Sequence, residues 1–245
     1  MTHHWRWLPG ALVVLLAGAC TTTPDAPGKS ALTLERMQQA AVDFTRARDA
    51  GDALAMARAA GVRRPFDHLT RAPGFLHSAV MFEEARRAAA GNEELLAQID
   101  ELENRASGPS FRAFSGGGQL AEKLASRCRF EHDAASASPL PAQRLPVGDR
   151  QPPSCVLTVD AKTSVQLRVD VRARRTLFVY VESKAGADLA LTIIDPAVTK
   201  PICSESQPHG YQACKWRPGR AATGIVEIRN DGNTSVSALL IARQS

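Results

Sequence analysis

The chain has 245 residues, of which 44% are hydrophobic and 22% are charged, and its formal net charge is +5. These fractions are ordinary for a globular protein, and the length suffices for one large domain or two small ones. The positive charge is weak and spread along the sequence. Composition therefore gives no reason to expect nucleic-acid binding, which usually requires a concentrated basic face with stacking aromatic side chains.

The first segment in chain order is a targeting signal. Arg6 and two histidines precede an apolar run from Leu8 to Leu16, and small residues follow at positions 17–19. A basic region, a short apolar region and small residues in this order are typical of a cleaved signal peptide. The run is about half the roughly twenty apolar residues that a membrane-spanning helix needs. We expect residues 1–19 to be removed.

Cys20 follows the small residues directly, and this arrangement resembles the lipobox of bacterial lipoproteins. The resemblance implies that Cys20 becomes the N-terminus of the mature chain and carries the lipid that attaches it to a membrane. Thr21, rather than Asp, stands next, which in the sorting pattern of such lipoproteins implies the outer membrane, facing the periplasm. The alternative is an ordinary signal peptide that is cleaved nearby, with Cys20 incidental.

Residues 20–30 contain threonines, prolines and a glycine, which predicts a flexible tether. In residues 31–133 the apolar side chains recur with the spacing of amphipathic helices. The residues that share one face of the first helix are Leu34, Met37, Ala41 and Phe44. The residues that mark further helices are Asp52 and Asn92, as caps, and Pro73, in a first turn. The pattern predicts an α-helical domain, a small bundle of antiparallel helices joined by short turns.

The second half of the chain has a different period. Residues 134–153 are rich in serine, alanine and proline, which predicts a linker between domains. From residue 154 to residue 245 the period is two, as where Val165, Leu167 and Val169 alternate with polar residues. Short alternating segments separated by turn residues indicate an antiparallel β-sandwich. The expected fold class is therefore α+β, with a helical bundle followed by a sandwich.

Parts of the second half resemble the bacterial pre-peptidase C-terminal domain. The resemblance lies in residues 186–195, 216–218 and 224–230, although Ile225 stands where the family usually has an aromatic residue. It implies a jelly-roll-like sandwich of the kind that is attached to secreted proteins, some of which bind calcium or polymeric substrates. Asp188 and Asp195 would then contribute to a calcium site, which needs about six to eight oxygen ligands. The alternative is that they are ordinary turn acids.

Four cysteines follow Cys20, at positions 128, 155, 203 and 214. An even number in an exported chain indicates disulfides. The neighbour pairing, Cys128 with Cys155 and Cys203 with Cys214, is favoured because each bond then closes a loop within one region. The other two connectivities stay open. A zinc site is the competing interpretation, but the spacings do not match paired CxxC motifs.

The segment from Pro201 to Pro218 is the candidate binding surface. Aromatic side chains beside cations in a loop that is fixed at two points are typical of contact sites, because binding then costs little ordering entropy. The candidate residues are His209, Tyr211, Lys215, Trp216 and Arg217. For Trp216, packing in the sandwich core is an equally reasonable role.

No set of residues in the sequence meets the requirements of a catalytic site, and none indicates a cofactor. We therefore expect a non-enzymatic, lipid-anchored envelope protein that binds another envelope component, either a protein complex or a glycan. One alternative is an inhibitor or immunity-type lipoprotein that blocks a periplasmic hydrolase with its disulfide-held loop. A further alternative is an enzyme with an unfamiliar site around His132 or His209.

Overall fold

The computed structural model describes residues 34–70, 75–107, 128, 131–132, 143–147, 154–184, 187–198, 200–206 and 210–245. Every described residue belongs to one compact unit, Leu32–Ser245. The predicted signal peptide, the lipidation site Cys20, the tether and most of the linker lie outside the described residues.

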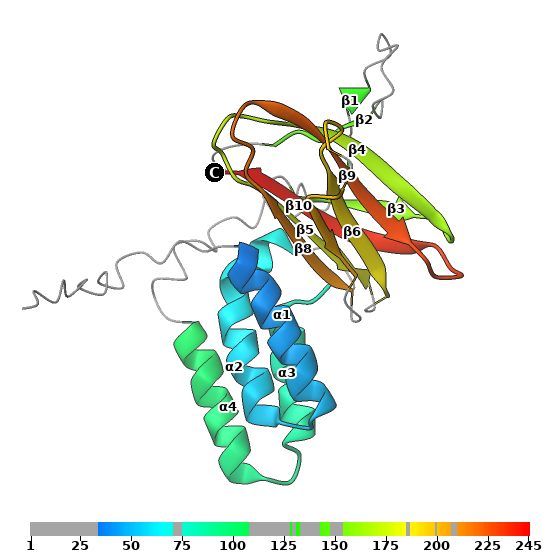
Figure 1. Cartoon of the computed structure of the whole chain (residues 1–245). Coiled ribbons are helices and arrows are strands. Elements are labelled where there is room, and N and C mark those ends of the chain that lie inside the picture. The colour runs from blue at the N-terminus through cyan, green and yellow to red at the C-terminus, as the bar shows by residue number, and fades with distance from the viewer. Residues whose placement is uncertain are drawn as a thin grey trace, which may run out of the picture. The chain divides into compact units, whose positions relative to one another are not determined.

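The described N-terminal part is helical (Figure 1). Its elements are α1 (Leu34–Asp49), α2 (Ala53–Arg63), the 3₁₀ helix η1 (Arg64–Leu69), α3 (Ser78–Ala88) and α4 (Glu93–Ala106). Asp52 and Asn92 cap α2 and α4 as predicted, because their side chains accept hydrogen bonds from the backbone N–H groups of Ala55 and Leu95. Within the described residues, no helix is both long and apolar enough to cross a membrane.

The third helix begins later than its sequence indicated. Pro73 was expected in its first turn, but α3 begins at Ser78, with His77 as the N-cap. The Asp67 carboxylate accepts hydrogen bonds from the backbone N–H and the hydroxyl of Ser78, at 2.9 and 2.5 Å. This contact with η1 fixes where the helix starts, since it satisfies a backbone donor that the helix itself cannot pair.

Small side chains bring the helices together around α2. This helix packs against α1, α3 and α4. Ala57 and Ala60 of α2 are fully buried in a cluster that includes Phe82 of α3 and Ile99 of α4. Alanine at these positions leaves room for large side chains from the neighbouring helices, so the apolar stripe seen in the sequence faces this cluster.

The described strands form two sheets (Figure 1). The strands are β1 (Glu131–His132), β2 (Gln143–Arg144), β3 (Ser154–Val159), β4 (Thr163–Val171), β5 (Leu177–Ser183), β6 (Leu189–Ile194), β7 (Cys203–Glu205), β8 (Tyr211–Trp216), β9 (Ala222–Asn230) and β10 (Val236–Gln244). The larger sheet has the order β1-β2-β4-β9-β6-β7, and the smaller has the order β3-β10-β5-β8.

The sheets pack face to face as a β-sandwich. Their shared core contains Leu167 and Ile193 of the larger sheet and Val179 and Leu240 of the smaller one, all buried. The pairing departs from the expected pattern at one point: β2 runs parallel to β4, through Arg144 and Arg168, whereas the other described pairings are antiparallel. The fold is thus α+β with a sandwich, while the bundle and jelly-roll descriptions stay predictions.

The smaller sheet is buried on both faces. Alternate residues of β5 and β10, such as Phe178, Tyr180 and Ile241, point away from the sandwich core and pack in a second cluster with residues of the helical part. The helical residues of that cluster are Leu34, Met37, Phe66, Leu69 and Phe75. All seven residues of β5 are consequently buried. Helices and sandwich therefore share a core, which the sequence pattern did not reveal.

Disulfides join Cys128 to Cys155 and Cys203 to Cys214, the neighbour pairing that the sequence favoured. Cys203 lies in β7 of the larger sheet and Cys214 in β8 of the smaller one, so this bond connects the two sheets. Cys155 lies in β3, and the backbone N–H of Cys128 donates to the carbonyl of Val156 at 2.9 Å.

Gly224 gives a test of the sandwich core. A Cβ atom at this position of β9 would lie 2.5 Å from Cζ3 of the Trp216 ring. Gly224→Ala should therefore destabilise the protein by about 1–3 kcal/mol, because the ring must move within a packed core. The control is Gly219→Ala, since a Cβ there meets nothing within 4 Å. Urea unfolding followed by circular dichroism checks both variants, and equal stability would contradict the packing of Trp216.

Candidate functional site

The segment marked by the sequence as a binding loop is mostly the strand β8. Trp216 is 5% exposed and belongs to the sandwich core, the alternative role given above. Tyr211 is 9% exposed and forms a hydrogen bond with Thr45 of α1, so its expected role as a surface contact is corrected. His209 lies outside the described residues. These residues do not form one exposed loop.

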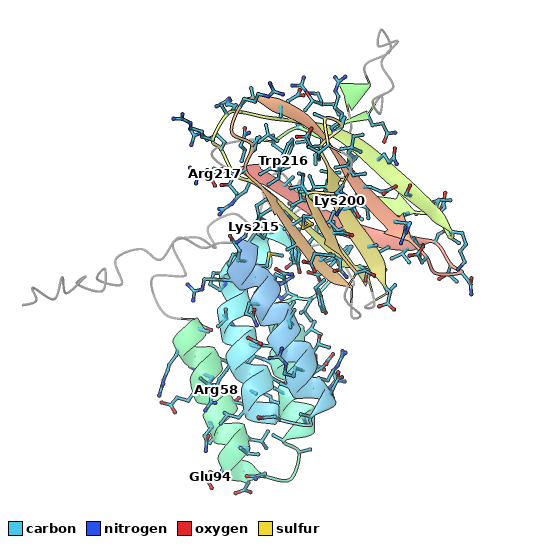
Figure 2. The ribbon with its side chains drawn as sticks, viewed as in Figure 1. Arg58, Glu94, Lys200, Lys215, Trp216 and Arg217 are labelled. Carbon is cyan, nitrogen blue, oxygen red and sulfur yellow. A yellow bond between two sulfur atoms is a disulfide. The ribbon has the colours of Figure 1, made fainter. Side chains whose placement is uncertain are left out.

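Lys215 and Arg217 of that segment contact different parts of the protein (Figure 2). Lys215 forms an ion pair of 2.8 Å with Glu35 of α1, and its Nζ lies 5.8 Å from the centre of the Phe178 ring. Arg217 is exposed, and its Nε donates to the backbone carbonyl of Arg174 at 3.0 Å. Among the described candidate residues, Lys215 and Arg217 are exposed, and their role as contact residues stays a prediction.

The candidate calcium ligands do not come together. Asp188 and Asp195 precede and follow β6, and seven residues of extended chain span roughly 20 Å. The Asp195 carboxylate accepts a hydrogen bond from the backbone N–H of Ala197, which is the geometry of an ordinary turn acid. In the described parts of the chain, no group of three or more His, Cys, Asp or Glu side chains is placed to hold a metal ion.

A basic surface lies at one end of the sandwich, where β4 and β8 end and β5 and β9 begin. The strand register brings these ends together, because Val171 pairs with Ala222 and Leu177 pairs with Trp216. The exposed arginines of the two turns, which we call the arginine end, are Arg172, Arg174, Arg175, Arg217 and Arg220. Guanidinium groups are well suited to bind carboxylate or phosphate in a bidentate manner.

The two turns of the arginine end are fastened to each other. The backbone N–H of Arg174 donates to the carbonyl of Pro218 at 2.8 Å, and Arg217 reaches back to the carbonyl of Arg174. Arg174 has a φ of 59°, in the left-handed region. Because hydrogen bonds hold the turns in place, a partner would meet a surface that is already ordered, which lowers the entropy cost of binding.

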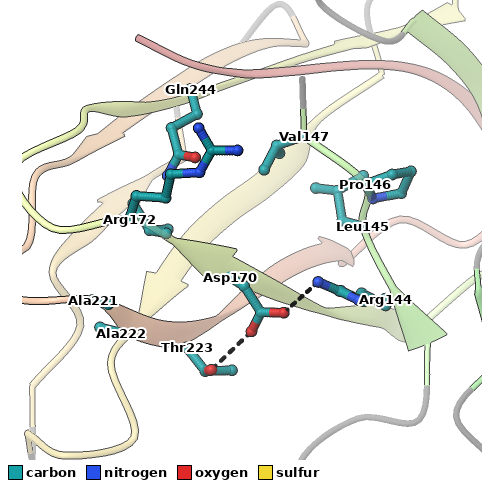
Figure 3. A pocket seen from close by; sticks show the side chains of 11 residues that line it. Arg144, Leu145, Pro146, Val147, Asp170, Arg172, Ala221, Ala222, Thr223 and Gln244 are labelled. Carbon is teal, nitrogen blue, oxygen red and sulfur yellow. Dashed lines mark hydrogen bonds and ion pairs between the residues drawn. The ribbon is translucent and has the colours of Figure 1, made fainter. Parts of the chain in front are cut away.

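A pocket of about 570 Å³ adjoins the arginine end (Figure 3). We call it the mouth pocket. Segment 143–147 forms one wall, where Leu145 is buried in the sandwich core and its backbone N–H donates to the carbonyl of Arg168 at 2.7 Å. The residues that line it are Arg144, Leu145, Pro146, Val147, Asp170, Val171, Arg172, Ala221, Ala222, Thr223 and Gln244.

Two polar side chains of the mouth pocket, Asp170 and Gln244, differ in their hydrogen-bond partners. The Asp170 carboxylate pairs with Arg144 at 2.7 Å and accepts a hydrogen bond from the Thr223 hydroxyl at 2.8 Å. Gln244, the last residue of β10, is only 4% exposed. Its Nε2 has no hydrogen-bond partner among the described residues.

Neither the arginine end nor the mouth pocket was predicted from the sequence. The sequence does show arginines in residues 172–175 and 217–220, and each of these segments follows an alternating stretch. Only the pairing of the strands shows that both turns reach the same end of the sandwich. Segment 143–147 lies within the predicted linker, so its contribution to a pocket wall had no counterpart in the sequence analysis.

A second polar cluster is buried between the helices and the smaller sheet. Arg63, at the end of α2, is fully buried, and its Nη2 lies 2.5 Å from Oε2 of Glu182 in β5. The Arg63 guanidinium also donates to the Tyr180 hydroxyl at 3.1 Å and to the carbonyl of Met37 at 3.3 Å. Glu182 accepts further hydrogen bonds from the Tyr180 hydroxyl and from the backbone N–H of Leu76. The cluster is closed to solvent and serves the structure.

The pKa shifts agree with a charged pair inside the core. Burial by itself would lower the pKa of the Arg63 guanidinium, but Glu182 and Tyr180 outweigh it and raise that pKa above its usual value. Burial raises the pKa of the Tyr180 phenol well above its ordinary range, and the Glu182 charge adds to this. Arg63 is therefore a permanent cation that Glu182 neutralises.

Removal of one charge of this pair should be strongly destabilising. Arg63→Met leaves Glu182 as a buried carboxylate without its cation, a change that costs about 3–5 kcal/mol in other proteins. The double variant with Glu182→Met should recover part of that loss, since neither charge then remains. Thermal or urea unfolding measures both effects. Arg87→Met removes an exposed pair with Glu83 and should change stability little. Equal stability of Arg63→Met and Arg87→Met would contradict the buried pair.

The tyrosines give a pH test. The sequence has two, Tyr180 and Tyr211, and burial raises the pKa of Tyr211 to about 12 from an ordinary value of 10. Raised folded-state pKa values mean that the fold favours the neutral phenol, so this stability is complete below pH 10 and is lost as the pH rises toward 12. Phenolate absorbance of the folded protein should accordingly show no step near pH 10. Tyr211→Phe should remove the step near pH 12, and a step at pH 10 in the folded protein would contradict this burial.

The chain is similar to some proteins of known structure, but at low sequence identity. No protein-family model and no curated protein matches the sequence. Among solved structures, the chain is similar to PliG from Aeromonas hydrophila, a periplasmic inhibitor of g-type lysozyme, with 8% identity over 39% of this chain and 87% of that chain and a TM-score of 0.32. It is also similar to the pre-peptidase C-terminal domain of a Bacillus anthracis collagenase, with 8% identity, 36% and 86% coverage and a TM-score of 0.30.

A third similar structure is CapF from Staphylococcus aureus, a capsular polysaccharide assembling protein, with 8% identity, 60% coverage of this chain, 43% of that chain and a TM-score of 0.30. At these identities and TM-scores the similarity carries no conclusion about activity or partners. The class of the protein therefore follows from its own geometry: an α+β protein with a sandwich, with a basic surface and a polar pocket at one end.

Proposed function

We propose that this chain is a non-enzymatic binding protein of the bacterial cell envelope, attached by lipid at Cys20 and exposed to the periplasm at the outer membrane. The signal-like residues 1–19 and the lipobox-like position of Cys20 support export and anchoring. Disulfides support the same location, because such bonds persist in oxidising compartments.

The arginine end carries the proposal that the protein binds another envelope component. Its arginines are exposed, and they lie on two turns that hydrogen bonds connect to each other. Surfaces of this kind attract anionic partners over a distance and then hold them by charge-assisted hydrogen bonds. We therefore assign the arginine end, rather than the segment around Tyr211 and Trp216, as the binding face.

The test is a crosslinked pull-down of the lipidated protein from solubilised envelopes, read by mass spectrometry. The variant Arg175→Glu with Arg220→Glu reverses two charges of the arginine end. The matched control, Arg58→Glu with Arg87→Glu, makes the same change in net charge on exposed residues of α2 and α3. We expect one component to be recovered with the wild-type chain and the control, and to fall about ten-fold or more with the arginine-end variant.

The dependence of binding on salt concentration gives a second test in the same experiment. Recovery of the component should fall as ionic strength rises, since exposed charges are screened beyond about 10 Å at ordinary salt concentrations. Circular dichroism checks that the variants are folded. Equal recovery with the arginine-end variant and the control, or no recovered component with the wild-type chain, would refute the proposed binding face.

A further inference from the structure

The mouth pocket contains a buried donor with no acceptor. Gln244 is 4% exposed, lines the pocket, and has an Nε2 without a hydrogen-bond partner among the described residues. Leu240 and Ala242 precede it on the same face of β10 and point into the sandwich core, so the strand fixes Gln244 at the mouth of that core. A buried donor without an acceptor is costly, so a ligand that supplies an acceptor would gain a hydrogen bond here.

The charge around the pocket indicates what kind of acceptor this is. The walls contribute the guanidinium groups of Arg144 and Arg172 and the carboxylate of Asp170. Asp170 pairs with Arg144 at 2.7 Å and accepts a hydrogen bond from Thr223, and the lining side chains together carry two positive charges and one negative charge. In Figure 3, Arg172 and Gln244 lie on one side of the pocket and segment 143–147 on the other. A negatively charged oxygen between them would receive hydrogen bonds and charge together.

The size and the apolar wall limit the ligand to a small molecule or one unit of a polymer. The volume of about 570 Å³ lies within the range of small-molecule sites, roughly 300–1,000 Å³. The apolar side chains that line the pocket are Leu145, Pro146, Val147, Val171, Ala221 and Ala222. They offer a surface for the uncharged body of the ligand, while the polar groups hold its charged end.

We propose that the mouth pocket binds an anionic sugar unit, whose carboxylate or phosphate accepts a hydrogen bond from the Gln244 amide and faces the Arg172 guanidinium. The choice of a sugar rests on the proposed function, because the pocket adjoins the arginine end and envelope polymers present such units. The binding event itself rests on the pocket alone. It can therefore be measured on the purified full chain without the envelope partner.

The experiment is isothermal titration calorimetry with glucuronic acid, inorganic phosphate and glucose as probes. We expect glucuronic acid or phosphate to bind with one site per chain, and glucose to bind at least about ten-fold more weakly, since it lacks the charge. Stronger binding of glucuronic acid identifies a carboxylate as the ligand group, and stronger binding of phosphate identifies a phosphate. Equal binding of glucose, or no binding of any probe, overturns the inference.

Two variants act in opposite directions. Gln244→Leu removes the donor and should weaken anion binding about ten-fold, whereas the control Gln98→Leu, on α4, should leave it unchanged. Asp170→Asn removes the negative charge of the pocket and should strengthen anion binding, a result that loss of folding cannot imitate. Unchanged binding in Gln244→Leu, or weaker binding in Asp170→Asn, overturns the inference. A wild-type chain that binds no probe but still captures its component through the arginine end would retain the proposed function.

Discussion

The ion pair between Arg63 and Glu182 is the interaction on which the arrangement of helices and sheets depends. Both side chains are removed from water, and further hydrogen bonds offset part of the cost of that burial. Tyr180, the carbonyl of Met37 and the N–H of Leu76 supply these bonds from β5, α1 and the segment before α3, whereas Nε of Arg63 has no partner among the described residues. One buried charge pair thus specifies how several elements meet.

The position of this pair explains where recognition can occur. Helices cover one face of the smaller sheet and the larger sheet covers the other, so neither face of the smaller sheet is available to a partner. The outer face of the larger sheet and the ends of the strands remain, and at these ends the turns carry side chains that no sheet packs against. The arginine end and the mouth pocket lie at one such end, and they combine a fixed backbone with exposed charge. The sandwich thus holds the residues of this site in place, although most of them do not belong to its packed core.

Periodicity in the sequence identified most of the helices and strands, but not β1 and β2 and not what packs on the second face of each strand. The spacing of Leu34, Met37 and Phe44 and the caps at Asp52 and Asn92 identify helices, because these signals are local. Strand alternation shows that a strand has two faces but not what covers each of them. Tyr211 was therefore expected as a surface contact, and the burial of Arg63 was not predicted. The parallel pairing of β2, and with it a wall of the pocket, depends on contacts between distant segments.

The disulfides lie at the open margins of the sandwich. β7 and β8 are the outermost strands of the two sheets on one side, and Cys203–Cys214 joins them. On the other side β3 is the outermost strand of the smaller sheet, and Cys128–Cys155 holds chain against it. Unprotected margins of this kind can add strands from other molecules. The covalent bonds therefore hold neighbouring chain at both margins, and a reducing environment would free these strands for pairing with strands of other molecules.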